Sequence, residues 1–187
     1  MKQRAIIVHC WEGTPEYCWY PWVKQQLETA GFTVDVPAFP HTEAPTQADW
    51  VPFLSQSVGR PDKDLVLIGH SVGVITILRY LETLTTDQAI GAAVFVAGFT
   101  DDLGYTELAN YFTTPLQYPT YREHCDRFVG IFSDDDPHVP VAQADIFREK
   151  LNAEIIVKEK MGHFSGPVDD ESSCRQLPEV VLAVEGK

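Results

Sequence analysis

The sequence has no long hydrophobic run and few basic residues, and each shortage excludes a class of protein. Its longest apolar run, residues 92–99, is far shorter than the roughly eighteen residues that a membrane-spanning helix needs. Its 14 Lys and Arg and 27 Asp and Glu side chains give a net charge of -13, which repels nucleic acid phosphates and anionic lipid surfaces. We therefore expect neither nucleic acid nor membranes as partners.

Cysteine is scarce, and the usual metal and nucleotide motifs are missing. The 4 cysteines lack CxxC spacing and the 6 histidines lack an HxxxH pair, so a zinc site has little support and we expect no metal. Neither GxxxxGK[ST] nor GxGxxG occurs, which makes a nucleotide binder a minor alternative and predicts no cofactor. The first residues have too short an apolar segment for a secretory signal, so we expect a cytoplasmic protein with reduced thiols.

Short aliphatic runs alternate with segments of helical period, which is typical of a parallel sheet with helices on both faces. The runs predicted as strands are residues 5–9, 32–37, 65–69, 92–97, 127–133 and 154–158. Helices are predicted over residues 19–31, 46–58, 72–84 and 141–151 and from Pro178 onward, with Thr46 as a helix cap and Gly31 as a helix stop. The sequence therefore predicts an α/β fold in one domain, 1–187, with a six-stranded, mainly parallel sheet.

The connection at residues 98–126 is longer than the others and rich in aromatic rings. Two interpretations stay open: the segment forms a small cap over a cleft, or its rings fill a satellite core beneath a loop. The rings belong to Phe99, Tyr105, Tyr111, Phe112, Tyr118 and Tyr121.

The stretch GHSVG lies between a predicted strand and a predicted helix, which is the context that GxSxG requires for a nucleophile. A sharp turn there strains the backbone of Ser71 and exposes its side chain at the carboxyl edge of the sheet, and glycines at 69 and 73 remove Cβ atoms that would collide. Ser71 is therefore the candidate nucleophile. The alternative is a serine that only shapes the turn.

A serine nucleophile needs a histidine to accept its proton and a carboxylate to orient that histidine. His163 follows the sixth predicted strand, which places it at the same edge of the sheet as Ser71. For the acid, three consecutive aspartates follow the fifth strand. Asp136, whose backbone is fixed by the next proline, is preferred, with Asp134 in reserve and Asp101 less favoured.

The oxyanion hole is predicted to combine the backbone amides of Val72 and Trp11, the second from the loop after the first strand. Three further residues are expected to contact the substrate: Cys10, His70 and Phe99.

These segments together resemble the α/β hydrolase superfamily, and within it the small serine hydrolases related to retinoblastoma-binding protein nine and its bacterial relatives. The resemblance rests on HCWEG followed by WYPWVKQQLE, on GHSVG, on SDDDPHVP and on the final GHF. It implies a compact fold with a small or absent cap, and Ser71, Asp136 and His163 as nucleophile, acid and base. Cys10 departs from the glycine usual in the family, which puts the second oxyanion donor in question.

The leading hypothesis is a cofactor-independent serine hydrolase acting on a small-molecule ester, thioester or amide. The alternative is a noncatalytic protein of the same fold that binds a protein partner through residues 98–126.

Overall fold

The computed structural model describes residues 3–165 and 174–186, and its strands form one sheet in the order β2-β1-β3-β4-β5-β6. Every pair of neighbouring strands in it is parallel. The six predicted strands are thereby confirmed, with ends that differ by at most two residues. They are β1 (Arg4–Val8), β2 (Thr33–Asp35), β3 (Leu65–His70), β4 (Ala92–Val96), β5 (Phe128–Ser133) and β6 (Glu154–Lys158).

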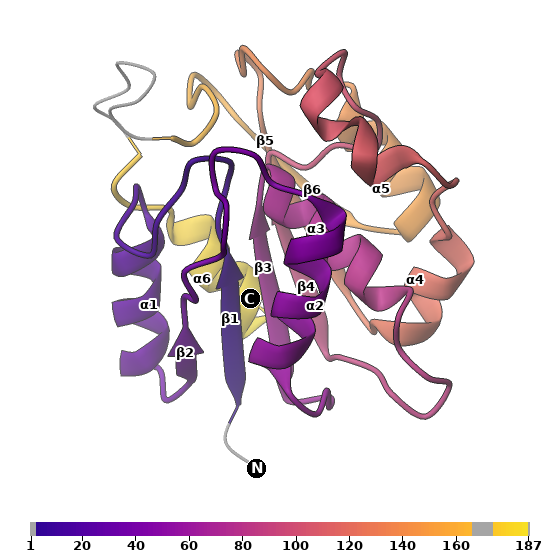
Figure 1. Cartoon of the computed structure of the whole chain (residues 1–187). Helices are drawn as coiled ribbons and strands as arrows, with labels where there is room; N and C mark the ends of the chain where they lie inside the picture. The colour runs from indigo at the N-terminus through magenta and orange to yellow at the C-terminus, as the bar shows by residue number, and fades with distance from the viewer. Residues whose placement is uncertain (1–2, 166–173, 187) are drawn as a thin grey trace.

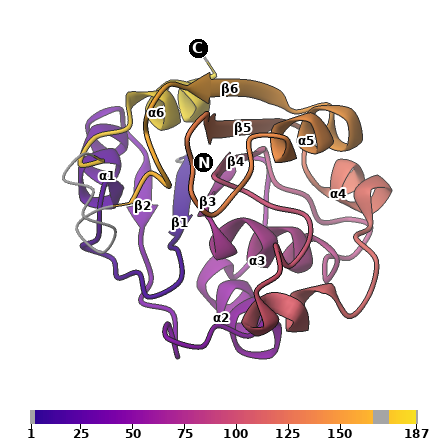
Figure 2. The same ribbon diagram turned by 90° about the horizontal axis from the view of Figure 1, so that it is seen from above.

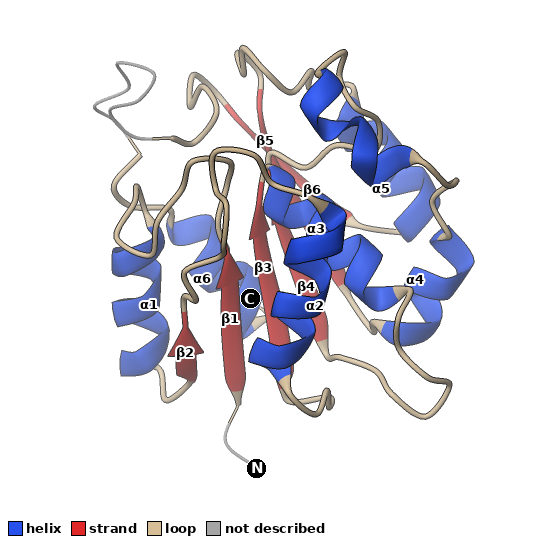
Figure 3. Ribbon diagram, viewed as in Figure 1, coloured by secondary structure: helices blue, strands red, loops and turns tan. Residues whose placement is uncertain are grey.

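Helices cover both faces of this sheet (Figures 1 and 3). The helices α1 and α6 pack on one face, and α2, α3 and α5 pack on the other, as the view from above also shows (Figure 2). Their bounds are α1 (Tyr20–Thr29), α2 (Gln47–Val58), α3 (Val72–Leu81), α4 (Tyr118–His124), α5 (Gln143–Leu151) and α6 (Pro178–Glu185), with the 3-10 helix η1 at Thr106–Phe112.

The predicted helix signals act as expected. The Thr46 side chain accepts a hydrogen bond from the amide of Asp49 in the first turn of α2. Gly31 takes a φ of 99° just after α1, a conformation that favours glycine and ends the helix. Helix α6 begins at Pro178, where the missing amide is not needed.

Residues 98–126 contain two elements that the sequence did not predict, η1 and α4. Both are held by contacts with α3 rather than by a periodic apolar pattern of their own. The buried guanidinium of Arg79 donates hydrogen bonds to the carbonyl oxygens of Tyr111 and Thr114. The rings of Tyr111 and Tyr121 are fully buried in the core that α3 shares with the sheet.

The strand order reverses at β1, since the chain passes outward to β2 and then returns to β3 on the other side. The loops after β1 and β3 consequently diverge at the carboxyl ends of these strands, where open α/β sheets bind their ligands. In Figure 1 this is the edge to which the arrowheads point. In the part of the chain that the structure describes, no helix has both the length and the apolar character needed to cross a membrane.

Candidate active site

Ser71 occupies a strained turn between β3 and α3. Its φ of 55° and ψ of -120° lie outside the regions that side chains prefer, and its amide donates a hydrogen bond to the carbonyl oxygen of Val96 at the end of β4. A Cβ added at Gly73 would lie 2.2 Å from the carbonyl oxygen of Val8, so only glycine lets the helix start approach β1. Ser71 is 9% exposed, which makes it less open than the sequence predicted.

The Ser71 hydroxyl does not cap the helix that follows it. Serine at this position commonly accepts a hydrogen bond from an amide of the first turn, yet within the described chain Ser71 makes no such bond. The helix start therefore gains no capping bond from this hydroxyl, which weakens the interpretation of Ser71 as a turn residue alone.

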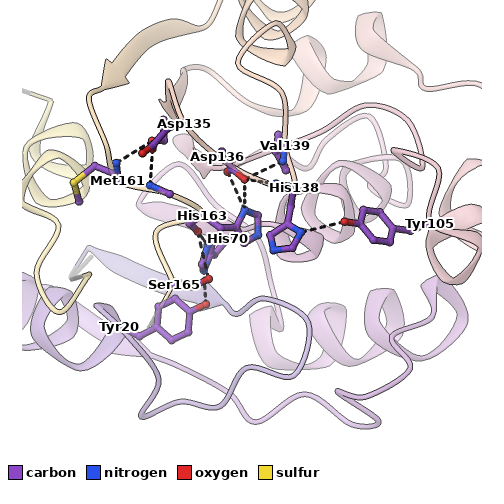
Figure 4. Close-up of polar contacts among 12 residues, drawn as sticks. Tyr20, His70, Tyr105, Asp135, Asp136, His138, Val139, Met161, His163 and Ser165 are labelled. Carbon is purple, nitrogen blue, oxygen red and sulfur yellow. Dashed lines mark hydrogen bonds and ion pairs between the residues drawn. The ribbon is translucent and has the colours of Figure 1, made fainter. Parts of the chain in front are cut away.

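His163 and Asp136 form a direct, buried pair (Figure 4). The His163 Nδ1 atom lies 3.0 Å from Asp136 Oδ1 and 2.9 Å from Oδ2. The Asp136 carboxylate also accepts the backbone amides of His138 and Val139, so its orientation is fixed. Since the carboxylate can only accept when ionised, Nδ1 of His163 carries a hydrogen and Nε2 is the nitrogen left to act as a base.

The other two aspartates hold the loop that carries His163. The Asp134 carboxylate accepts the amide of Lys160, and the Asp135 carboxylate accepts the amide of Gly162 and the hydroxyl of Ser133. The hydrogen bond from Ser133 is the main cause that lowers the pKa of Asp135. Asp136 is therefore the aspartate that pairs with His163. Asp134, the reserve candidate, binds the backbone of the loop instead.

Asp101, the less favoured acid, is engaged elsewhere. Its carboxylate accepts the amide of Leu103 and the side-chain amide of Gln143.

The loop after β1 presents one backbone amide that has no acceptor among the described residues. The amides of Cys10, Glu12 and Gly13 donate to the Tyr20 hydroxyl, the Thr42 carbonyl and the Cys10 carbonyl. Within residues 10–13, all of which are described, Trp11 is the exception. Val72 is the first residue of α3, a position whose amide has no intrahelical acceptor.

Cys10 stands on the wall of the cavity, and Gly13 makes room for its side chain. A Cβ added at Gly13 would approach the Cys10 Sγ atom to 3.1 Å and the Cys10 carbonyl oxygen to 2.8 Å. Cys10 is only 4% exposed.

Ser71 and His163 both line one cavity of about 460 Å³. Of the residues expected to contact the substrate, Cys10 and Phe99 also line it. Trp11, predicted for the oxyanion hole, lines it as well. The remaining lining residues could not be predicted as site residues, because they come from loops whose paths depend on long-range contacts. These others are Glu12, Tyr17, Glu43, Leu103, Tyr105, Glu107, Leu108, His138, Val139 and Ser165.

His70 lies beneath the cavity instead of in its wall, so the expectation that it contacts substrate is corrected. Its ring has no exposed surface and bonds on both sides to protein groups, the Tyr20 hydroxyl at 2.7 Å and the His163 carbonyl oxygen at 2.8 Å (Figure 4). Successive side chains of a strand point to opposite faces of the sheet, so a residue next to the nucleophile in sequence can point into the core.

The segment 98–126 combines the two interpretations that the sequence left open. Its first part lines the cavity through Leu103, Tyr105 and Leu108, and the Tyr105 hydroxyl bonds to His138 Nδ1 at 3.0 Å. Its second part packs into the main core. The segment therefore serves as both a cavity wall and a core element.

Within residues 3–165 and 174–186, no group of three or more His, Cys, Asp or Glu side chains is placed to hold a metal ion.

A parallel sheet with helices on both faces, a strained serine after β3 and an Asp–His pair in the loops after β5 and β6 define the α/β hydrolase fold. The model of the Serine hydrolase family matches residues 5–184, and the chain belongs to this family. This confirms the resemblance found in the sequence.

Relatives and solved structures agree with that assignment. Serine hydrolase RBBP9 of Rattus norvegicus is 30% identical over 149 residues, covering 78% of this chain and 77% of the relative. The crystal structure of the ydeN gene product from Bacillus subtilis matches with a TM-score of 0.89 at 25% identity, over 99% of this chain and 100% of that one. Est1E from Butyrivibrio proteoclasticus shares the fold, with a TM-score of 0.75 at 16% identity over 98% of this chain and 87% of its own.

Two buried histidines near the site should make stability depend on pH. Burial lowers the pKa of His70 to about 3 and also lowers that of His9, from an ordinary value of 6.5. The unfolded chain then binds protons that the folded chain does not, so stability is lost as the pH falls below 6.5. Near pH 5, the unfolding free energy should fall by about 1.4 kcal/mol per pH unit because of His70, and His9 should act in the same direction.

Urea denaturation of the wild type and of His70→Gln between neutral pH and about pH 4.5 checks this expectation. Because the variant lacks one titrating group, its stability should fall less steeply with acid, whatever its stability at neutral pH. Parallel curves for the two proteins would show that His70 does not titrate in this way.

Proposed function

We propose that this protein hydrolyses small esters, and by the same route thioesters or amides, through an acyl-enzyme on Ser71. The observation that carries the proposal is the shared cavity: a serine whose hydroxyl does not cap its helix lines the same cavity as a histidine paired with a buried carboxylate. The cavity volume of about 460 Å³ suits small ligands, and we infer acyl groups of modest size. The cytoplasmic location predicted from the sequence stays a prediction.

The reaction would proceed in two steps. The Ser71 hydroxyl attacks the carbonyl carbon while His163 Nε2 takes its proton, and the resulting imidazolium gives that proton to the departing alcohol, thiol or amine. A water molecule then attacks the acyl-enzyme by the same route and releases the acid. Asp136 holds the tautomer of His163 and stabilises its charged form. No cofactor takes part in this scheme.

The negative oxygen that forms in each step would be held by the backbone amides of Val72 and Trp11. The support for this pair is the position of Val72 at the start of α3 and the unused amide of Trp11. Donors of this kind stabilise a tetrahedral intermediate by about 3 to 4 kcal/mol each.

Reaction with a fluorophosphonate probe tests the proposal. The wild type should be labelled rapidly, because its serine is activated, and Ser71→Ala should not be labelled. Folded wild-type protein that the probe leaves unmodified would count against hydrolysis. A stable, specific protein complex in that case would support the noncatalytic alternative.

The charge of the cavity predicts a preference among substrates. Glu12, Glu43 and Glu107 line the cavity, whereas no Lys or Arg does so among the described lining residues. A p-nitrophenyl ester with a carboxylate at the far end of its acyl chain should therefore react with a lower kcat/KM than a neutral ester of similar length, by about three- to tenfold, relative to the spontaneous hydrolysis of each.

The three glutamates are exposed, so salt should screen their effect. The difference between the two esters is expected to shrink in about 1 M NaCl. Glu43→Gln should also reduce it, and Glu149→Gln, which removes the same charge from a helix away from the cavity, should not. An anionic ester that reacts as fast as the neutral one at low salt would contradict the prediction.

A further inference from the structure

Three loops meet at the candidate site, and they come from strands that are not all neighbours. The loop after β1 carries the Trp11 amide, the turn after β3 carries Ser71, and the loop after β6 carries His163. Since β4 and β5 separate β3 from β6, the last loop must reach back across the sheet edge. A serine–histidine reaction tolerates little error in these positions, because a displacement of about 1 Å can cost about a hundredfold in rate.

A buried chain of three hydrogen bonds joins these loops underneath the cavity. The Cys10 amide lies 3.0 Å from the Tyr20 hydroxyl, that hydroxyl lies 2.7 Å from His70 Nδ1, and His70 Nε2 lies 2.8 Å from the carbonyl oxygen of His163. Tyr20 and His70 are both 0% exposed. Figure 4 shows Tyr20, His70 and His163 in this arrangement.

The Cys10 amide, the Tyr20 hydroxyl, the His70 ring and the His163 carbonyl allow only one donor-to-acceptor direction along this series of hydrogen bonds. A carbonyl oxygen only accepts, so Nε2 of His70 must carry the hydrogen that reaches His163. In a neutral ring Nδ1 then accepts, so the Tyr20 hydroxyl donates to it and its own oxygen is free to accept the Cys10 amide. Every donor and acceptor in the chain is satisfied, as a buried polar network requires.

The Cys10 backbone is held at both ends. Its carbonyl oxygen accepts Nδ1 of His9, 2.9 Å away, because Nε2 of His9 already accepts the Phe39 amide. With the amide of Cys10 bound to Tyr20, the peptide that presents the next amide, that of Trp11, has a fixed orientation.

We propose that Tyr20 and His70 are positioning residues of the active site, which fix the loop of the Trp11 amide and the loop of His163 relative to Ser71. The inference rests on the proposed function. Neither residue touches the substrate, since both lie below the cavity wall. His70 directly precedes the nucleophile, so a displacement of its ring moves the base and the nucleophile relative to each other.

Tyr20→Phe tests the first half of the chain. It removes one hydroxyl and leaves the ring, and kcat for p-nitrophenyl butyrate should fall by about ten- to a hundredfold while KM changes by less than about threefold. Tyr111→Phe is the matched control. That ring is equally buried, and its hydroxyl bonds only to the Thr76 hydroxyl among the contacts described, at 3.2 Å. Equal effects of the two variants on kcat would overturn the proposal.

Two variants of His70 distinguish the contributions of its two ring nitrogens. The side-chain amide of His70→Gln can reach the position of Nε2 and still donate to His163, whereas that of His70→Asn reaches only the position of Nδ1. His70→Gln should therefore keep about tenfold more kcat than His70→Asn. The same kcat for both, in proteins that denaturation shows to be folded, would overturn the proposal.

The tautomer of His70 can be measured without any activity. Nitrogen NMR of the imidazole rings should show hydrogen on Nε2 and not on Nδ1 of His70, and Tyr20→Phe should shift its Nδ1 resonance. A hydrogen on Nδ1 in the wild type would overturn the proposal even in an active enzyme. Conversely, a wild type that fails to react with fluorophosphonate while His70 has the expected tautomer would reject the proposed function and retain the hydrogen-bonded chain.

Discussion

Ser71→Ala should lower the turnover of p-nitrophenyl butyrate by at least about a thousandfold, because it removes the only atom in the scheme that attacks the substrate. The substitution tests chemistry rather than folding. Alanine keeps the Cβ atom and the strained φ of 55°, and the hydroxyl that is lost makes no helix-capping bond. The free energy of unfolding should therefore change by less than about 1 kcal/mol.

A second serine provides the control for this variant. Ser165 also lines the cavity, and its hydroxyl lies 3.5 Å from the carbonyl oxygen of His163, at the limit of a hydrogen bond. Ser165→Ala should keep turnover within about tenfold of the wild type, because a contact of this length contributes little. If Ser165→Ala lost activity and Ser71→Ala kept it, the assignment of the nucleophile would be wrong.

The sheet could be predicted because its strands are nearly continuous aliphatic runs. All six residues of β3 and all ten of α3 are buried, so the chain around Ser71 shows the composition expected of buried elements at a parallel sheet. Helices η1 and α4 could not be predicted in the same way. The end of η1 is held by the buried guanidinium of Arg79, a charged side chain that the sequence gives no reason to place inside, and α4 is tied to the end of α3 by the hydrogen bond from the Tyr121 hydroxyl to Glu82.

The Asp–His pair could also be predicted, because parallel strands bring their carboxyl ends to one edge. Chain order and strand position selected His163 and the three aspartates after β5, and the following proline favoured Asp136 among them. The structure shows His163 and Asp136 in contact. The roles of Asp134 and Asp135 could not be foreseen, since a run of carboxylates usually faces solvent. They depend on the path of residues 160–162, which only the folded loop defines.

The buried chain below the cavity was missed for a related reason. Tyr20 belongs to the WYPW segment on which the family resemblance partly rests, but nothing in the sequence indicates a function for its ring. His70 was predicted to contact the substrate. The orientation of the His70 side chain is known only from the fold. The ring points inward and meets a carbonyl oxygen that is 93 positions away in the chain.

Asp136→Asn should reduce kcat by about ten-thousandfold while the fold persists. The Asp136 Oδ1 atom accepts two backbone amides, and the side-chain oxygen of asparagine can continue to accept them. The other side-chain atom then becomes an amide donor facing His163 Nδ1. His163 would have to accept there and carry its hydrogen on Nε2, which is the wrong tautomer to take a proton from Ser71.

Asp134→Asn is the matched control, since it removes the same charge two positions away. The Asp134 carboxylate accepts the amide of Lys160, and the carbonyl oxygen of asparagine can do the same. Activity should therefore stay within about tenfold of the wild type. A large loss in Asp134→Asn with little loss in Asp136→Asn would transfer the role of acid to the reserve candidate. Equal and large losses in both would mean that the loop depends on the total charge of the three aspartates, and that the contact between Asp136 and His163 does not itself set the rate.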